Sequence, residues 1–145
     1  MRTRAEIASD ATAPDYSGES LDRLNRVTVE LTSIFNEAGF EPIEPAILQP
    51  AALLFDLYGE EIWDRAFFVE DGGEDSWCLR PDFTAPVAQG NLRRLAAGET
   101  GAAARYGYVG PAFRRSRAGE DAPVQHLQAG VEAISAGGGS VAELC

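Results

Sequence analysis

A helical segment followed at once by two prolines constrains the start of this chain most strongly. Apolar residues recur at spacings of three and four over residues 20–38, which is the pattern of a helix with one apolar face. Gly39 is the residue type that most often ends a helix. Pro42 and Pro45 then exclude a helix for residues 40–45, so we expect an extended segment there, as an edge strand or a strand's first residues.

Short helices and extended runs alternate through the rest of the chain. Two further helices are expected, and the second of them has Pro86 in its first turn, where proline is tolerated. Extended runs that flank glycine-rich or polar loops indicate hairpins. This order favours an α+β domain with a mainly antiparallel sheet flanked by helices. The expected helices cover residues 50–58 and 83–95, and the expected strands cover residues 66–70, 76–80, 104–113 and 124–134.

The length suits one domain, since 145 residues is an ordinary domain size. A hydrophobic content of 45% is too high for a disordered acidic chain. We expect residues 1–19 to form a polar N-terminal arm and residues 20–135 to form the core. Residues 136–145, which contain three successive glycines, are expected to form a flexible tail.

The charge is acidic overall and basic in one segment. The net charge of −11 argues against general binding to nucleic acid or to a membrane surface, because both need a positive footprint. All 12 basic residues are arginines, and seven of them lie between residues 80 and 117, where the only acids are Asp82 and Glu99. A basic segment inside an acidic chain suits a small anionic ligand.

Cysteine and histidine content excludes several other classes of site. Cys78 and Cys145 form no paired motif, and with a single histidine we expect no metal site. Two unpaired cysteines fit a reducing compartment. Because the chain has neither a secretory signal pattern nor a long apolar stretch, we expect a cytoplasmic protein without a membrane partner.

Three polar motifs become informative when they are taken together. Leu79–Pro86 reads LRPDFTAP, Tyr108–Arg115 reads YVGPAFRR, and Gln125–Glu132 reads QHLQAGVE. In the third motif, side chains at every second position point to one side of a strand, so Gln128 and Glu132 share a face. Local explanations remain open for the first motif, because its acidic and hydroxyl side chains are also good helix caps.

These motifs resemble the catalytic core of class II aminoacyl-tRNA synthetases, and within that class the histidyl-tRNA synthetase branch. The helix of residues 20–38 and the segment of residues 40–45 resemble the dimer-forming motif 1, and Tyr108 to Glu132 resembles the motif 2 hairpin. The resemblance implies an α+β class II fold that is incomplete at the C-terminus, because nothing matches motif 3. In the synthetases an acid contacts adenine where this chain has Ser116. With Asp82 in place of a glutamate, the pattern is closer to the regulatory subunits of ATP phosphoribosyltransferase.

The resemblance also implies roles for individual residues. Asp82 and Thr84 would bind the α-amino group of histidine, and Gln128 would add a neutral acceptor to the same group. Glu132 would line the histidine pocket. Arg114 would face a carboxylate or a phosphate, for which its planar guanidinium is suited. For Arg115 and Arg117 the residues alone leave two explanations open, contact with an anion or solvation of their loop.

The function implied is that of a non-catalytic regulatory subunit without a cofactor. It would activate a short catalytic subunit of ATP phosphoribosyltransferase, sense L-histidine, and associate with itself through residues 20–38 and 40–45. Two alternatives stay open: a histidyl-tRNA synthetase or a fragment of one, and a vestigial dimerisation module. Because Ser116 stands in the adenine-contact position, tRNA charging, and therefore tRNA as a partner, is not expected.

Overall fold

The structure, a computed structural model, describes residues 13–70, 76–99, 101, 103–116 and 123–135. The expected tail of residues 136–145 and most of the expected arm lie outside these ranges. The chain divides into two compact units. The first unit comprises residues 1–15, 47–81 and 111–126, and the second comprises residues 16–46, 82–110 and 127–145.

Helix α2 opens the second unit and covers Gly18–Glu37. The helix therefore starts slightly earlier than the sequence pattern indicates, and the Ser20 hydroxyl accepts a hydrogen bond from the Ser17 backbone N–H at 3.0 Å. Gly39 has a φ of +80°, so the predicted glycine stop is confirmed. The next segment is extended, as predicted, and strand β1 (Glu41–Pro42) lies at the edge of a sheet.

A three-stranded sheet with the order β1, β5, β6 forms the centre of the second unit. Strand β5 covers Ala103–Phe113 and strand β6 covers Gln125–Ser135, which matches both predicted strands within one residue. The two strands are joined by a loop whose base is closed by the Arg114 N–H bonding to the Val124 carbonyl at 2.9 Å. Strand β1 pairs with β5 in the parallel sense, so this sheet is mixed rather than wholly antiparallel.

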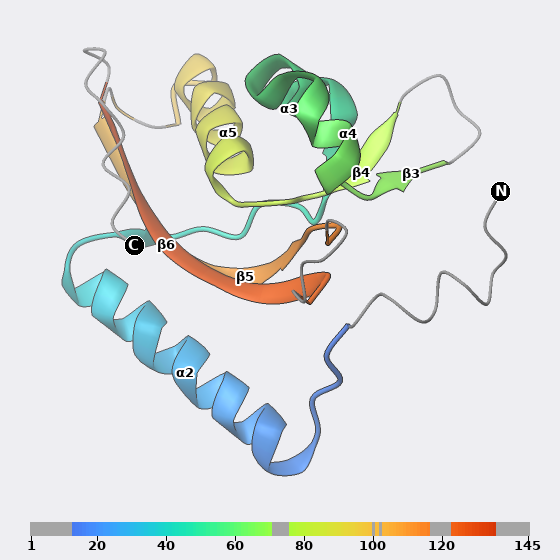
Figure 1. Cartoon of the computed structure of the whole chain (residues 1–145). Helices are drawn as coiled ribbons and strands as arrows, with labels where there is room; N and C mark the ends of the chain where they lie inside the picture. The colour runs from blue at the N-terminus through green and yellow to red at the C-terminus, as the bar shows by residue number, and fades with distance from the viewer. Residues whose placement is uncertain (1–12, 71–75, 100, 102, 117–122, 136–145) are drawn as a thin grey trace, which may run out of the picture. The chain divides into compact units, whose positions relative to one another are not determined.

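Two helices cover the two faces of this sheet, as Figure 1 shows. Helix α5 (Thr84–Ala96) packs on one face, where Phe83, Val87, Tyr106 and Tyr108 form a buried cluster. Helix α2 packs on the other face, where Gly107 of β5 lies against Phe35. A Cβ atom on Gly107 would come within 2.9 Å of the Phe35 Cβ, so the absence of a side chain allows this close approach.

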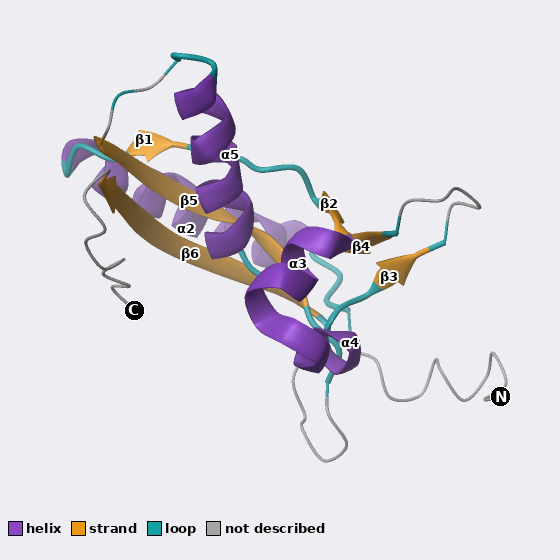
Figure 2. Cartoon of the chain, turned by 90° about the horizontal axis from the view of Figure 1, so that it is seen from above, coloured by secondary structure: helices purple, strands orange, loops and turns teal. Residues whose placement is uncertain are grey.

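The first unit has a small antiparallel sheet of its own, with the order β2, β4, β3 (Figure 2). The predicted hairpin is confirmed by β3 (Phe68–Val69) and β4 (Trp77–Leu79), and residues 71–75 of its loop lie outside the described ranges. The predicted second helix is α3 (Ala51–Tyr58), which ends at a glycine with positive φ. Three short elements were not predicted: β2 (Leu48–Pro50), the 3₁₀ turn η1 (Gly59–Glu61) and α4 (Ile62–Arg65).

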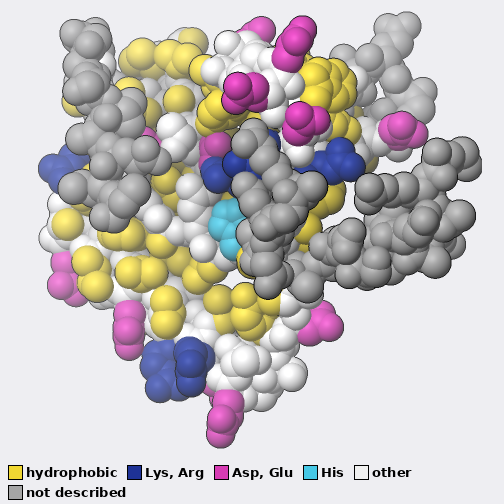
Figure 3. All heavy atoms as spheres, in the orientation of Figure 1, with side chains coloured by type: hydrophobic (Ala, Val, Ile, Leu, Met, Phe, Trp, Pro, Cys, Tyr) yellow, Lys and Arg dark blue, Asp and Glu magenta, His cyan; other side chains and the backbone are white. Residues whose placement is uncertain are grey.

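Aromatic rings and acidic side chains mark the helical part of the first unit. The Trp63 ring centroid lies 4.5 Å from that of Phe55 and 4.4 Å from that of Phe68, and Trp63 remains 52% exposed. Figure 3 shows acidic side chains gathered around apolar ones over α3 and α4. Among the described residues, no helix is long and apolar enough to cross a membrane.

Candidate functional site

The buried carboxylate of Glu132 is the centre of the candidate site in the second unit. Glu132 lies on β6 and is 2% exposed. Its Oε1 atom accepts a hydrogen bond of 2.8 Å from the Thr84 hydroxyl, at the start of α5. The Tyr108 hydroxyl on β5 lies 3.5 Å from the same oxygen. Buried carboxylates need such donors, because burial without hydrogen bonds strongly disfavours a charged group.

Asp82 is a second buried acid in the same unit, with 8% exposure. Its Oδ1 atom accepts from the backbone N–H of Ala85 at 3.4 Å, which is a long contact at the N-terminus of α5. The helix dipole favours negative charge there. Asp82 therefore stabilises the start of α5, as the helix-cap explanation of the first motif predicts. Capping does not explain Thr84, because its hydroxyl bonds to Glu132 on another element.

Gln128 and Gly130 precede Glu132 on β6. A Cβ atom on Gly130 would come within 2.5 Å of the Tyr108 hydroxyl, so Gly130 and Glu132 both lie against Tyr108, as expected for alternate residues of a strand. The Gln128 Oε1 atom is buried, and within the described part of the chain it has no hydrogen-bond partner. A buried acceptor without a donor is uncommon and suits a ligand that carries N–H groups.

The arginines of the basic segment make local contacts in both units. In the first unit, Arg114 donates from Nε to the Pro81 carbonyl at 2.8 Å, and the Arg115 backbone N–H bonds to the Arg65 carbonyl at 2.8 Å. Arg80 is completely buried and donates from Nε to the Pro111 carbonyl at 2.8 Å. Arg117 lies outside the described residues.

Arg93 and Arg94 on α5 differ from each other. Because both lie on an expected helix inside a run of charges, the sequence predicts that they form a solvated face. This expectation holds for Arg93, which is exposed and donates to the Gln89 side chain at 2.7 Å. For Arg94 it is wrong, because the Arg94 guanidinium carbon lies 4.8 Å from the centre of the Tyr106 ring. Its Nε atom also donates to the Tyr106 hydroxyl at 3.3 Å. Both groups lie in the second unit and help to fix α5 on the sheet.

Titration is perturbed at two residues of the first unit. Burial raises the pKa of Cys78 to about 11, and its Sγ atom contacts the Gln49 carbonyl at 3.4 Å. Burial and then the positive charge of Arg114 lower the pKa of His126. Both shifts favour neutral side chains near neutral pH, so neither residue resembles an activated nucleophile or a cationic ligand group. Among the described residues, no group of three or more metal-ligating side chains could hold a metal ion.

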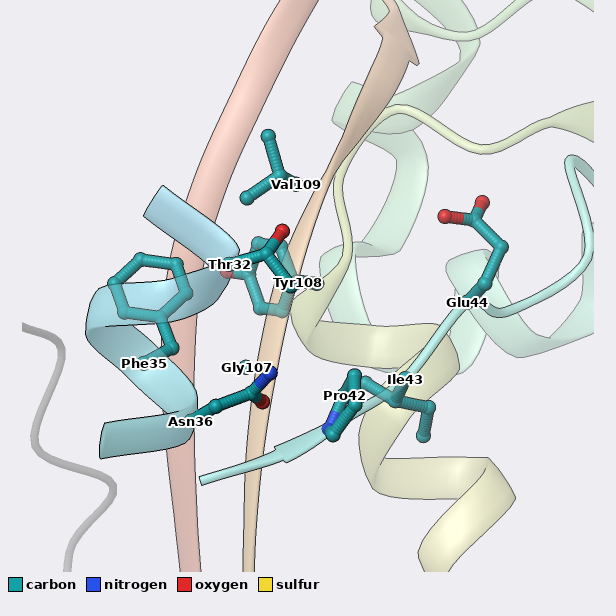
Figure 4. Close-up of a pocket in the computed structure, with 9 residues that line it drawn as sticks. All are labelled: Thr32, Phe35, Asn36, Pro42, Ile43, Glu44, Gly107, Tyr108 and Val109. Carbon is teal, nitrogen blue, oxygen red and sulfur yellow. The ribbon is translucent and has the colours of Figure 1, made fainter. Parts of the chain in front are cut away.

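A separate cavity of about 230 Å³ lies between the end of α2, the segment around β1, and β5 (Figure 4). Phe35 and Asn36 reach it from α2, and Pro42 and Ile43 reach it from the β1 segment. Its lining includes none of the five predicted histidine-site residues, but it does include Tyr108, the residue whose hydroxyl approaches Glu132.

The predicted site residues are therefore placed as follows. Thr84 and Glu132 are in direct contact, and Asp82 and Gln128 belong to the same unit. The arginines at positions 114 and 115 belong to the first unit. Sequence reasoning gave no role to the Tyr108 hydroxyl. The signal that could have found it is the glycine at position 130, opposite a tyrosine on the neighbouring strand.

Comparisons of the sequence with protein families and with curated proteins agree with each other. A sequence model of the family described as histidyl-tRNA synthetase matches residues 13–143. Curated proteins from Brucella ovis and Brucella canis, both named ATP phosphoribosyltransferase regulatory subunit, are 38% identical to this chain over 112 residues. That match covers 77% of this chain and 27% of each relative, so the chain spans about a quarter of the length of these proteins.

Solved structures give the same picture of the fold. A histidine–tRNA ligase subunit from Alicyclobacillus acidocaldarius superimposes with a TM-score of 0.69 at 26% identity, over 83% of this chain and 33% of the other. A Bacillus halodurans protein described as an ATP phosphoribosyltransferase regulatory subunit/histidyl-tRNA synthetase gives a TM-score of 0.67 at 21% identity, over 92% and 33%. The predicted α+β fold of the class II synthetase type is therefore confirmed.

Proposed function

The chain belongs to the histidyl-tRNA synthetase family, and from that membership we propose that it acts as a non-catalytic regulatory subunit of ATP phosphoribosyltransferase. The observation that carries this proposal is the 38% identity to proteins named as regulatory subunits of that enzyme. Ser116 adds support, because a neutral hydroxyl stands where the resemblance places the acid that contacts adenine. A serine cannot provide the charge of a carboxylate, so ATP-dependent activation of an amino acid is disfavoured.

The second part of the proposal is that the buried acids of the second unit, together with Thr84 and Gln128, bind L-histidine. Two buried carboxylates, Asp82 and Glu132, suit the positive charge of an α-amino group. The Thr84 hydroxyl orients the Glu132 carboxylate through its 2.8 Å bond. Gln128 brings a buried oxygen that has no donor among the described residues, and an ammonium group would supply one.

Arg114 enters the proposal on the resemblance, and Arg115 and Arg117 enter it on their place in the basic segment. Arg114 would bind a ligand carboxylate or phosphate, and Arg115 and Arg117 would add anion contacts. Within the first unit, the Arg114 Nε atom donates a hydrogen bond to the Pro81 carbonyl at 2.8 Å. A guanidinium has five N–H donors, so this one bond is compatible with a ligand contact through the others.

Regulation would follow from thermodynamic linkage. If histidine binds one state of the assembly more tightly than another, it shifts the population of states and changes the activity of the catalytic partner. The partner would be the short catalytic subunit of ATP phosphoribosyltransferase. Binding of that subunit must then change the affinity for histidine by the same factor, because linkage is reciprocal.

Self-association through α2 and the β1 segment is the third part of the proposal. Helix α2 has 20 residues and none of them is buried. Val29 is 67% exposed and Ile34 is 57% exposed, and large exposed apolar side chains on one helix are a common feature of protein interfaces. Sedimentation of the wild-type chain and of the Val29→Asp/Ile34→Asp variant tests this part, with Glu30→Gln as the control on the same helix.

Calorimetry with L-histidine is the main test of the site. The wild-type chain should bind, and Asp82→Asn and Glu132→Gln should each weaken binding at least tenfold, because a charged hydrogen bond is worth about 1.5 to 3 kcal/mol. Glu99→Gln is the matched control, since Glu99 is exposed. Co-purification with a short catalytic subunit tests the partner. Absence of histidine binding by the folded wild-type chain contradicts the sensing role.

A histidyl-tRNA synthetase is the second candidate, favoured by the family match and by the Alicyclobacillus structure. It requires ATP-dependent histidine activation, so steady histidine-dependent pyrophosphate exchange would favour it over the regulatory role.

A vestigial dimerisation module is the third candidate. It would be preferred if the chain self-associates while Asp82→Asn changes neither histidine binding nor activation of the partner.

A further inference from the structure

Tyr108 is held in one position by its neighbours on β5, β6 and the start of α5. Its ring stacks on Phe83 with a centroid distance of 4.4 Å and an interplanar angle of 2°. Both rings are buried, with 4% exposure for Tyr108 and none for Phe83. A parallel partner in a packed interior leaves the ring little room to rotate, so the direction of its hydroxyl is fixed.

Gly130 provides the space into which that hydroxyl projects. A Cβ atom built on Gly130 would lie 2.5 Å from the Tyr108 hydroxyl oxygen and 2.7 Å from the adjacent ring carbon. Gly130 has no positive φ, so its backbone conformation does not require glycine. Glycine is therefore required at position 130 to leave room for the Tyr108 hydroxyl, and the strand backbone would accept other residues there.

The hydroxyl approaches the acid of the candidate site. It lies 3.5 Å from Glu132 Oε1, which is the long limit for a hydrogen bond, and Thr84 donates to the same oxygen at 2.8 Å. Phe83 and Thr84 are consecutive residues, so the start of α5 touches Tyr108 through one side chain and Glu132 through the next. The carboxylate is thus held between donors on β5 and α5.

From this geometry we infer that Tyr108 is a positioning residue for the amino-acid site, acting through Glu132. The inference deepens the proposed function and rests on it. A phenylalanine at position 108 would keep the stack on Phe83 and would fill nearly the same volume. The part of Tyr108 that a phenylalanine lacks is the hydroxyl, which is the group that approaches the Glu132 carboxylate. Its effect is to hold Glu132 in the orientation that meets the α-amino group of the ligand.

Tyr108→Phe is the direct test, because it removes one oxygen and keeps the ring. We expect the dissociation constant for L-histidine to rise about threefold to tenfold, because the contact of the hydroxyl with the Glu132 carboxylate is long and therefore weak for a hydrogen bond. Tyr106→Phe is the matched control on the same strand, since the Tyr106 hydroxyl donates to Asn91 at 3.0 Å and not to Glu132. The control should lower the unfolding temperature without changing histidine affinity.

A second pair of variants separates positioning from general stability. If Tyr108 acts through Glu132, Tyr108→Phe should change histidine affinity in the wild-type background and have no further effect in the Glu132→Gln background. Equal affinity loss in both backgrounds would overturn the inference. Wild-type affinity in Tyr108→Phe, together with weakened binding in Glu132→Gln, would also overturn it while leaving the proposed function intact.

Crystal structures of the wild-type chain and of Tyr108→Phe supply a measurement that needs no ligand. We expect the Glu132 side chain to change its orientation when the Tyr108 hydroxyl is removed. Of the Tyr108 and Thr84 hydroxyls, which both contact its carboxylate, only that of Thr84 would remain. An unchanged carboxylate overturns the inference whether or not histidine binds. Failure of the proposed function would instead show as absence of histidine binding in every variant, including the wild-type chain.

Discussion

The hydroxyl of Thr84 and the carboxylate of Glu132 meet in a 2.8 Å hydrogen bond although 48 residues separate them in the sequence. The bond joins the first residue of α5 to the third strand of the sheet in the second unit. One partner is a charged group that is almost completely buried. A contact of this kind links the stability of the unit to the geometry of its candidate site.

Thr84→Val should therefore destabilise the protein, by about 1.5 to 3 kcal/mol for a hydrogen bond to a charged group. Valine keeps the branched shape, so the loss comes from the missing donor. Denaturant unfolding monitored by circular dichroism measures the change. Thr32→Val is the control, because the Thr32 hydroxyl bonds to the Thr28 carbonyl within α2, at 2.7 Å. Equal free energies of unfolding for the wild type and Thr84→Val would contradict the assignment.

Gly107→Ala should destabilise the second unit by about 1 to 3 kcal/mol, the usual range for an overpacked core. The new Cβ would meet the Cβ of Phe35 at 2.9 Å, and that atom cannot move without displacing α2. Gly101→Ala is the control, since its Cβ would have no heavy atom within 4 Å. Equal melting temperatures for the two variants would contradict the close approach of α2 to β5 at Gly107.

Cys78 should react slowly with thiol reagents in the folded protein. Burial raises its pKa to about 11, so at pH 8 the side chain is the neutral thiol, and the residue is completely buried. The measurement uses a Cys145→Ser background, so that Cys78 is the one thiol that can react. The rate with a disulfide reagent should rise by orders of magnitude in denaturant. Rapid reaction in the native state would contradict the buried placement.

His126 should make the folded state less stable in acid. Its pKa is lowered in the folded protein by burial and by Arg114, so the unfolded chain binds the proton more tightly. Stability is then unaffected above the unfolded pKa of about 6.5 and falls as the pH decreases from there through the lower folded value. Unfolding of the wild type and of His126→Asn between pH 7.5 and pH 5 should show a smaller loss in the variant.

Nuclear magnetic resonance titration of the His126 ring measures the same shift directly. Arg114→Gln should move the pKa of His126 part of the way back towards its usual value, because the charge is the smaller of the two causes. A His126 pKa at or above the usual value in the wild type would contradict the prediction.

Long periodic segments were predictable because their pattern depends on local chemistry. Helix α2 and strands β5 and β6 lie within one or two residues of the expected positions. The short β2 was missed because its three residues, including Pro50, carry no period and are ordered by pairing with β4. Helix α4 has four residues, too few for a helical pattern to show.

The candidate site was predictable in its residue types more than in its contacts. Motif resemblance selected Thr84 and Glu132, but their bond depends on how β6 and α5 pack, which no local pattern encodes. The role of Tyr108 depends on its register opposite Gly130, for the same reason. The Nε contact of Arg114 with the Pro81 carbonyl is likewise a product of tertiary packing.

Strand β6 is the last strand in its sheet, and among the described residues no further strand pairs with its outer side. It has 11 residues, which is long for an edge strand. A row of backbone N–H and C=O groups along such an edge is a template for another chain. Preparations of this chain by itself should therefore be handled at low concentration, and a peptide that adds one strand to β6 should keep them monodisperse.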